Sequence, residues 1–321
     1  MRIMRFGKVR VERAVEIGLL ALFILTAYLG LTLSRVDRAL PTSSASELLQ
    51  KAWEAFREGK TADFMILSWH ARLKDPDSPQ ARFNIALVYY LNKWVKDAEV
   101  EIDRIIERDP RNVQARLLKA RILGLEGDIE GANREYELVL SIDPLNPEAH
   151  YYLGVNLQAI DPARAEEELR AAIEGDPDLK QPLLDDYPYG LMARLQLGRL
   201  LYDQGKLDEA IAILEEGYSL RPDYKELTSQ LVDYLKKKAE TYQTGYRDYL
   251  KALEIYEKVV EIDPNDAEAW EWIGKINRFF LDDYETALKA FKKAYELTNA
   301  PEYLANVREI ELLMKSEGES R

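Results

Sequence analysis

Proline recurs along most of the chain at a nearly constant spacing, and this repetition constrains the fold more than any other feature. The first two intervals are 34 residues each, and the prolines that mark the series are Pro76, Pro110, Pro144, Pro177, Pro222 and Pro264. Within residues 191–224, apolar residues recur every three or four positions, Gly205 and Lys206 interrupt them, and Pro222 ends the second run. This pattern predicts two short helices per interval. Such a chain grows by stacking repeats, so its 321 residues do not have to form several separate cores.

Small residues accompany the repeat at two fixed places. The first series consists of Ala52, Ala86, Ala120, Gly154, Gly198 and Gly274. The second consists of Ala98, Ala132, Ala165, Ala210, Ala252 and Ala287. A methyl group or a hydrogen atom lets two helix backbones approach to about 8–10 Å. In this respect the chain resembles the tetratricopeptide repeat family, which needs small residues at the eighth and twentieth positions of each unit. The resemblance covers about residues 45–300.

The resemblance implies an all-α fold, a right-handed superhelical solenoid of about seven units over residues 45–300. A capping helix and tail are expected at residues 301–321. The units should start near Ala45, Pro79, Val113, Pro147, Leu191, Lys225 and Ala267. The first unit departs from the pattern, because Phe64 stands where the family has alanine. Terminal units of stacked repeats are often atypical, so this departure is compatible with the fold.

Two insertions interrupt the regular spacing. About eleven residues are added at Lys180–Gly190, and the stretch from Lys225 to Ala252 is about eight residues longer than the other units. Insertions in stacked repeats form loops or longer helices on one face, and they often bind partners. They can equally reflect tolerated drift, because lengthening a loop costs little free energy. The sequence favours neither interpretation.

An uncharged stretch of eighteen residues runs from Ile17 to Ser34 near the N-terminus. A helix of this length spans roughly 27 Å, close to the roughly 30 Å hydrocarbon core of a bilayer. A cleaved signal peptide is the alternative, but its apolar segment is usually about 7–15 residues long. No good small-x-small cleavage site follows this stretch. We therefore predict a transmembrane signal anchor at residues 17–34, a basic N-terminus at 1–16 and a linker at 35–44.

The basic residues around this stretch predict its orientation. Five arginines and lysines precede it, whereas only Arg35 and Arg38 follow it closely. By the positive-inside rule, the N-terminus lies in the cytoplasm and the C-terminal body lies outside it, on the periplasmic or cell-surface side. Beyond residue 44 the chain has 37 basic and 54 acidic residues. A body this acidic repels phosphate backbones, so we expect no nucleic-acid partner.

The residues needed for catalysis or metal binding are scarce. There is no cysteine, and the two histidines, His70 and His150, lack converging ligands for zinc. No phosphate-binding glycine loop, serine elbow or dinucleotide fingerprint is present. We therefore predict a protein that is not an enzyme, with no cofactor, no metal and no small-molecule substrate.

The family resemblance implies that partners bind in a concave groove lined by the first helix of each unit. In the first five units, the candidate partner-binding residues are Trp53, Phe56, Phe83, Leu87, Tyr90, Leu117, Arg121, Tyr151, Arg199 and Tyr202. The last two units carry charged residues at these positions: Glu226, Asp233, Lys236, Lys237, Glu268, Glu271, Lys275 and Arg278. Exposed aromatic rings beside arginine are typical of binding hot spots. We expect an extended peptide or a helix of a protein partner there, with about a third of the rings packed against neighbouring helices.

Three functional hypotheses follow from these features. The leading one is a membrane-anchored scaffold or assembly factor that displays its repeats outside the cytoplasm. A second keeps the repeats in the cytoplasm, as an assembly factor for a membrane complex. A third makes the chain a non-catalytic regulatory subunit of an envelope enzyme, and no residue of the sequence separates it from the first.

Overall fold

The structure, a computed structural model, describes residues 43–177 and 188–319. The predicted signal anchor at residues 17–34 lies outside these ranges. In the part of the chain that is described, no helix is both long enough and apolar enough to cross a bilayer. The described residues form fifteen α-helices and one short π-helix, so the predicted all-α class is confirmed. They divide into two compact units at Pro144 and Leu145, and each unit is treated separately below.

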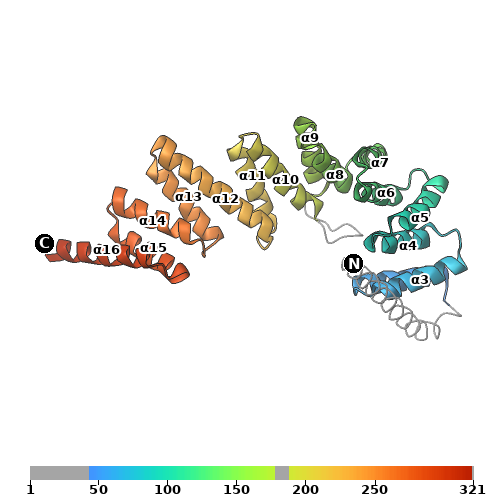
Figure 1. Ribbon diagram of the computed structural model, residues 1–321, viewed down its shortest axis with the longest axis horizontal. Helices are drawn as coiled ribbons and strands as arrows, with labels where there is room; N and C mark the ends of the chain where they lie inside the picture. Colours follow the sequence, from blue (N-terminus) through green and yellow to red (C-terminus); the bar gives the residue numbers. More distant parts are fainter. Residues whose placement is uncertain (1–42, 178–187, 320–321) are drawn as a thin grey trace, which may run out of the picture. The chain divides into compact units, whose positions relative to one another are not determined.

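Unit 1 contains three consecutive helix pairs (Figure 1). Each pair has a first and a second helix that pack side by side. The helices are α2 (Ala45–Arg57), α3 (Thr61–Lys74), α4 (Pro79–Leu91), α5 (Val95–Arg108), α6 (Val113–Glu126) and α7 (Ile129–Ile142).

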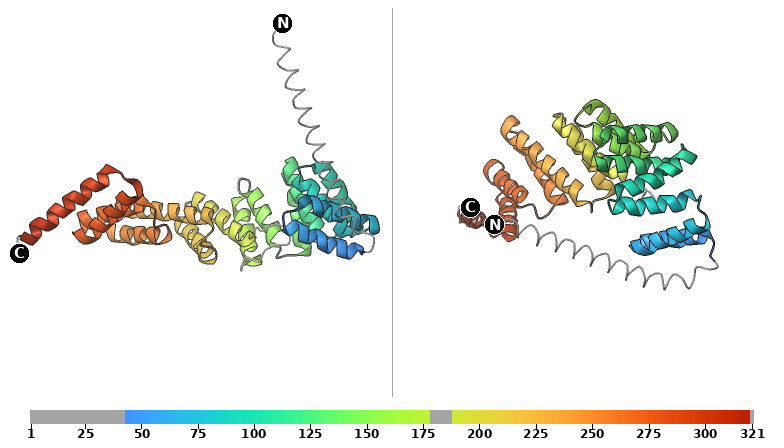
Figure 2. Two further views of the ribbon diagram at one scale, coloured as in Figure 1. Left: turned by 90° about the horizontal axis from the view of Figure 1, so that it is seen from below. Right: turned by 45° about the vertical axis from the view of Figure 1, so that its right-hand side comes forward.

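Unit 2 contains four further helix pairs and a final single helix. The last two helices of unit 2 that form a pair, α14 and α15, pack against each other, and α16, the red helix that ends at the C-terminus in Figure 2, packs against α15. The first three pairs are α8 (Pro147–Leu157) with α9 (Pro162–Gly175), α10 (Tyr189–Asp203) with α11 (Leu207–Leu220), and α12 (Lys225–Thr241) with α13 (Tyr249–Ile262). The π-helix η1 (Tyr242–Tyr246) follows α12, and the remaining helices are α14 (Ala267–Phe280), α15 (Tyr284–Thr298) and α16 (Pro301–Glu319).

Aspartate and asparagine side chains form the short connections between one pair and the next. At the end of α13, the Asp263 carboxylate accepts the backbone N–H of Asn265 at 3.0 Å. Asp266 then caps α14 by accepting the backbone N–H of Ala269 at 2.8 Å. Such caps satisfy backbone donors that a helix leaves unpaired at its start. The recurring proline therefore lies in a four-residue connection that both ends one helix and starts the next.

The small residues lie where the two helices of a pair approach most closely. A β-carbon added at Gly154 would lie 2.8 Å from Leu169 Cγ, and one added at Gly274 would lie 2.9 Å from Phe291 Cε2. The alanines of the second series are almost completely buried on the second helices. A larger side chain at either place would force the two helices apart. The physical reason given for the small residues is therefore confirmed in both units.

In the first helix pair, aromatic rings pack together at the place where the other pairs have a small residue. Phe64 is fully buried where the other second helices carry alanine. Its ring centroid lies 4.9 Å from that of Phe56 and 5.4 Å from that of Trp53. Tilted contacts of this kind are favourable for aromatic pairs. The departure at Phe64 therefore builds an aromatic cluster at the N-terminal end of unit 1.

A buried carboxylate connects three helices of unit 1. Glu101 on α5 forms ion pairs with Arg72 of α3 at 3.0 Å and with Arg82 of α4 at 2.9 Å. Arg104, on its own helix, lies 3.4 Å away. Carboxylates that accept several hydrogen bonds from arginine are held in a defined geometry. This cluster therefore fixes α3 and α4 against α5 with polar contacts as well as apolar packing.

Candidate partner-binding surface

The first helices of unit 2 touch their neighbours along one face, which we call the first-helix face. Arg199 of α10 donates to the Gln230 side chain of α12 at 3.2 Å. The rings of Tyr202 and Tyr234, from the same two helices, are stacked with centroids 4.4 Å apart. Burial raises the pKa of the Tyr234 hydroxyl to about 12, so it stays protonated at neutral pH.

Contacts of the same kind continue from α12 through α14 to α16. Lys236 pairs with Glu268 at 2.9 Å and with Asp266 at 3.0 Å. The Tyr303 hydroxyl donates to Glu271 at 2.8 Å. The guanidinium of Arg278 reaches Asn306 at 2.7 Å and also pairs with Glu309. Four successive first helices are thus linked by side chains about one repeat apart in the sequence.

These contacts neutralise much of the charge that the sequence places in the last two units. Besides the pairs made by Lys236 and Arg278, Lys275 pairs with Glu271 of its own helix. Lys236 is partly buried, which disfavours its charge, but its hydrogen bonds to Glu268 and Asp266 outweigh burial and raise its pKa. The charged positions therefore act largely as connections between repeats.

The ten candidate residues differ in how much surface they present. Arg199 is exposed, and Trp53, Phe56, Tyr90 and Tyr202 are half-buried. The other five are buried: Phe83, Leu87, Leu117, Arg121 and Tyr151. Two of the six rings are buried, and at least four of the six contact an aromatic ring of a neighbouring helix, which is more than the expected third.

Two of the aromatic candidates have structural neighbours that explain their burial or orientation. Tyr151 packs against Tyr152 and Tyr189, with ring centroids 5.1 and 5.7 Å away, and Tyr189 is fully buried. Tyr202 lies under the Lys237 ammonium, which is 5.1 Å from the ring centroid. The hydrogen bond between that ammonium and the Tyr202 hydroxyl raises the pKa of Lys237. Of the two predicted aromatic residues of unit 2, Tyr202 is the less buried, although Tyr234 and Lys237 both contact its ring, and Arg199 lies one helical turn away from it.

The insertion in the sixth repeat is ordered, and it shapes the surface around this face. It lengthens α12 to 17 residues and adds the five-residue π-helix η1. Arg247 then adopts φ +53°, in the left-handed region, and Asp248 caps α13. The sequence shows the extra length of this repeat, whereas its geometry is visible only in the structure. Of the first insertion, residues 178–187 lie outside the described part of the chain.

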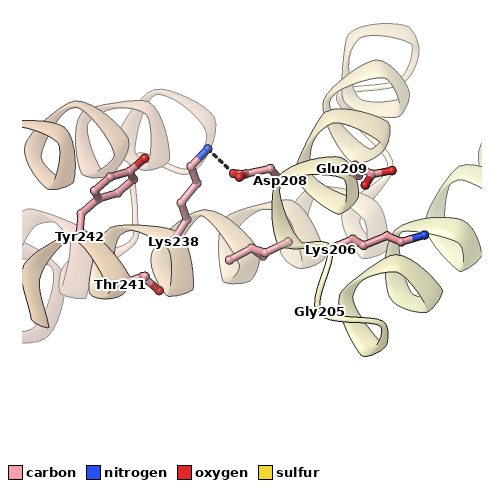
Figure 3. A pocket seen from close by; sticks show the side chains of 8 residues that line it. Gly205, Lys206, Asp208, Glu209, Lys238, Thr241 and Tyr242 are labelled. Atoms are coloured by element: carbon pink, nitrogen blue, oxygen red, sulfur yellow. Dashed lines mark ion pairs between the residues drawn. The ribbon is translucent and has the colours of Figure 1, made fainter. Parts of the chain in front are cut away.

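The lengthened α12 lines a cavity of about 420 Å³ beside the start of α11 (Figure 3). Lys238 of α12 forms an ion pair with Asp208 across it at 2.7 Å, as the dashed line shows. The other charged lining residues also pair, Lys206 with Glu166 and, at 3.9 Å, Glu209 with Arg170. The charges of this cavity are therefore satisfied within the chain.

The His150 ring nitrogen lies 2.7 Å from the Glu168 carboxylate, which makes His150 part of a polar contact between α8 and α9. Among residues 43–177 and 188–319, no group of three or more histidine, aspartate or glutamate side chains is arranged to hold a metal ion.

Part of unit 2 matches the model of a known family. A family model described as tetratricopeptide repeat matches residues 193–224, 247–266 and 267–301, which include most of α10 and all of α11 and α13–α15. The search of curated proteins gave no match.

Solved structures of repeat proteins are similar in fold. The C-terminal part of a TPR repeat-containing protein from Cytophaga hutchinsonii is 15% identical, with a TM-score of 0.56, over 81% of this chain and 99% of that one. PilF of Pseudomonas aeruginosa is 19% identical, with a TM-score of 0.45, over 73% and 96%. A TPR protein from Thermus thermophilus is 19% identical, with a TM-score of 0.47, over 60% and 99%. Of these three structures, the one from Cytophaga hutchinsonii has a TM-score above 0.5, and at 15% identity its similarity shows the fold alone. The helix pairs within residues 193–224 and 247–301 are similar to tetratricopeptide repeats.

Proposed function

We propose that this protein is a membrane-anchored scaffold that holds partner proteins on the first-helix face of its repeats, outside the cytoplasm. The observation that carries the proposal is the set of contacts from α10 to α16. They hold side chains of four successive first helices in fixed positions, and a preorganised surface loses less entropy when it binds. Repeats of this kind present extended binding surfaces. The proposal assigns the chain no catalysis of its own.

Photocrosslinking from Tyr202 tests the binding surface. The full-length chain would carry p-benzoylphenylalanine in place of Tyr202 and be irradiated in cells. We expect a covalent adduct with a partner protein, because Tyr202 is half-buried on the first-helix face beside the exposed Arg199.

The matched control for this experiment is Tyr218. It is also a half-buried tyrosine, but it lies on the second helix α11 of the same repeat. The same analogue at Tyr218 should give no adduct. Adducts from Tyr218 and none from Tyr202 would move the binding site to the second helices and contradict the proposal.

The membrane anchor and its orientation rest on the uncharged stretch at residues 17–34 and on the basic residues before it. Protease added to intact spheroplasts should digest the repeats and leave a short membrane-bound fragment. Protection of the repeats would instead place them in the cytoplasm. Recovery of intact repeats in the soluble fraction would show that the anchor is cleaved.

A further inference from the structure

Two exposed apolar side chains lie together near the C-terminal end of α3. Trp69 is 36% exposed and Leu73 is 71% exposed. Because they are four residues apart in a helix, they share one face of α3. We call these two residues the α3 patch. Single exposed leucines are common on protein surfaces, so the surroundings of the patch have to indicate what covers it.

Two basic side chains border the α3 patch. The guanidinium of Arg72 lies 4.9 Å from the centroid of the Trp69 ring and also pairs with Glu101 at 3.0 Å, so it supports the ring from one side. Lys74 directly follows the patch, and its ammonium donates to the backbone carbonyl of Ser43. Tryptophan and leucine beside lysine and arginine are typical of surfaces that lie at the boundary between lipid headgroups and hydrocarbon.

The hydrogen bond from Lys74 also fixes the point at which the predicted anchor leads into the repeats. Ser43, the first described residue, is buried and is held against the last turn of α3. Residues 35–42 connect it to the predicted anchor at residues 17–34, and they span at most about 30 Å when fully extended. With that anchor, the C-terminal end of α3 stays within this distance of the bilayer.

Charge distinguishes the first repeat from the rest of the chain. Residues 45–75 have five basic and five acidic side chains, whereas residues 76–321 have 32 basic and 49 acidic ones. An anionic lipid surface repels acidic protein, and at physiological salt this repulsion extends over about 8–10 Å. The neutral first repeat can therefore touch such a surface, which the chain as a whole would resist.

We propose that the α3 patch lies in the interfacial layer of the bilayer that holds the anchor. Leu73 inserts between the lipid chains, and Trp69 lies at the level of the headgroups. The membrane then holds unit 1 at two places, the anchor and the patch, so unit 1 cannot turn freely about residues 35–42. This inference rests on the proposed function, because it needs the membrane anchor.

A fluorophore at position 73 tests whether lipid covers the patch. The chain has no cysteine, so Leu73→Cys can be labelled with the environment-sensitive dye NBD at that position alone. The full-length chain would be reconstituted into vesicles of phosphatidylcholine and phosphatidylglycerol. We expect NBD emission at shorter wavelength than in detergent-free buffer, and loss of emission when the vesicles contain a phosphatidylcholine with a nitroxide near its headgroup.

The matched control is Leu138→Cys, an exposed leucine on α7, the second helix of the last pair in unit 1. NBD at position 138 should not be quenched by the nitroxide lipid. Equal quenching at both positions would overturn the inference. A shift to shorter wavelength at position 73 without quenching would also overturn it, because protein rather than lipid would then cover the patch.

Flotation of the same vesicles separates this inference from the proposed anchor. If the chain floats with the vesicles while position 73 is not quenched, the patch does not touch lipid, and the anchor still stands. If the chain does not float, both the anchor and the inference are wrong.

A second substitution distinguishes binding by the patch from mere closeness to the anchor. In the labelled Leu73→Cys chain, Trp69→Ser should reduce quenching, because it removes the interfacial ring. Its control is Trp94→Ser, which changes another exposed tryptophan of unit 1 and should leave quenching unchanged. Circular dichroism would check that both variants keep their helices. Unchanged quenching in the folded Trp69→Ser variant would show that the tether alone brings position 73 to the bilayer, and would overturn the proposal.

Discussion

Replacing Ala210 by glutamate is expected to destabilise unit 2 by about 4 kcal/mol or more, because it buries a charge that has no partner. Ala210 is fully buried on α11, where this helix packs along α10. Gly198→Trp should have a similar effect through overpacking. A β-carbon added at Gly198 would already lie 3.0 Å from Leu214 Cδ2. Urea unfolding of the full-length chain, followed by circular dichroism, measures both effects.

The matched control for Ala210→Glu is Ala212→Glu, two residues further along α11. Ala212 is exposed, so its substitution should change the unfolding free energy by no more than about 0.5 kcal/mol. Unchanged stability in Ala210→Glu and Gly198→Trp would show that these positions do not lie at the closest approach of α10 and α11. The register assigned to the repeat would then be wrong.

Combining Arg199→Ala with Tyr202→Ala is expected to weaken partner binding by roughly a thousandfold. Each well-placed anchor at a protein interface contributes about 2 kcal/mol or more, and two together correspond to about that factor in Kd. The ligand would be the partner recovered by crosslinking from Tyr202, and its Kd for the full-length chain would be measured in detergent. Arg199 is exposed, and its loss removes a hydrogen bond to Gln230 without opening the core.

Tyr202→Ala also removes the ring that stacks on Tyr234, so folding has to be monitored by circular dichroism. Arg199→Ala alone provides a variant whose fold is not in question, and it should weaken binding by roughly thirtyfold. Tyr151 is unsuitable for this test, because it packs against Tyr152 and Tyr189 in the interior of unit 2. If the double variant kept both full affinity and its helicity, the first-helix face would not be the binding surface.

The helical class and the placement of the small residues could be predicted because both depend on local sequence. A proline, an aspartate cap and a three- or four-residue apolar period act within one or two turns of a helix. Gly154 and Gly274 were recognised because any larger residue would clash with the facing helix, whatever the rest of the fold. Phe64 could be recognised as an exception, but its cluster with Trp53 and Phe56 is visible only in the structure.

The candidate binding surface was predicted less completely. The resemblance implies that the fifth and twelfth positions of each unit both face the groove, yet Phe83 and Tyr151 at the fifth position are buried, whereas Tyr90 and Tyr202 at the twelfth are half-buried. How much of a ring is covered depends on how the first helix of the next repeat packs against it. That helix lies about one repeat further along the sequence. For the same reason, the pairing of Lys236 with Glu268 could not be read from a list of charged positions.

By itself, the sequence determined that this protein consists of repeated helix pairs and where small residues allow close packing. These properties arise from interactions between residues near one another in the chain. Only the tertiary structure decided which side chains remain available and what the insertion in the sixth repeat forms. The surroundings of Gln243 result from the packing of η1, α13 and α14: the Tyr256 hydroxyl donates to its amide oxygen, and its Nε2 has no hydrogen-bond partner among the described residues. The repeat pattern of the sequence does not predict this arrangement, because it depends on how helices from two repeats pack against an irregular turn.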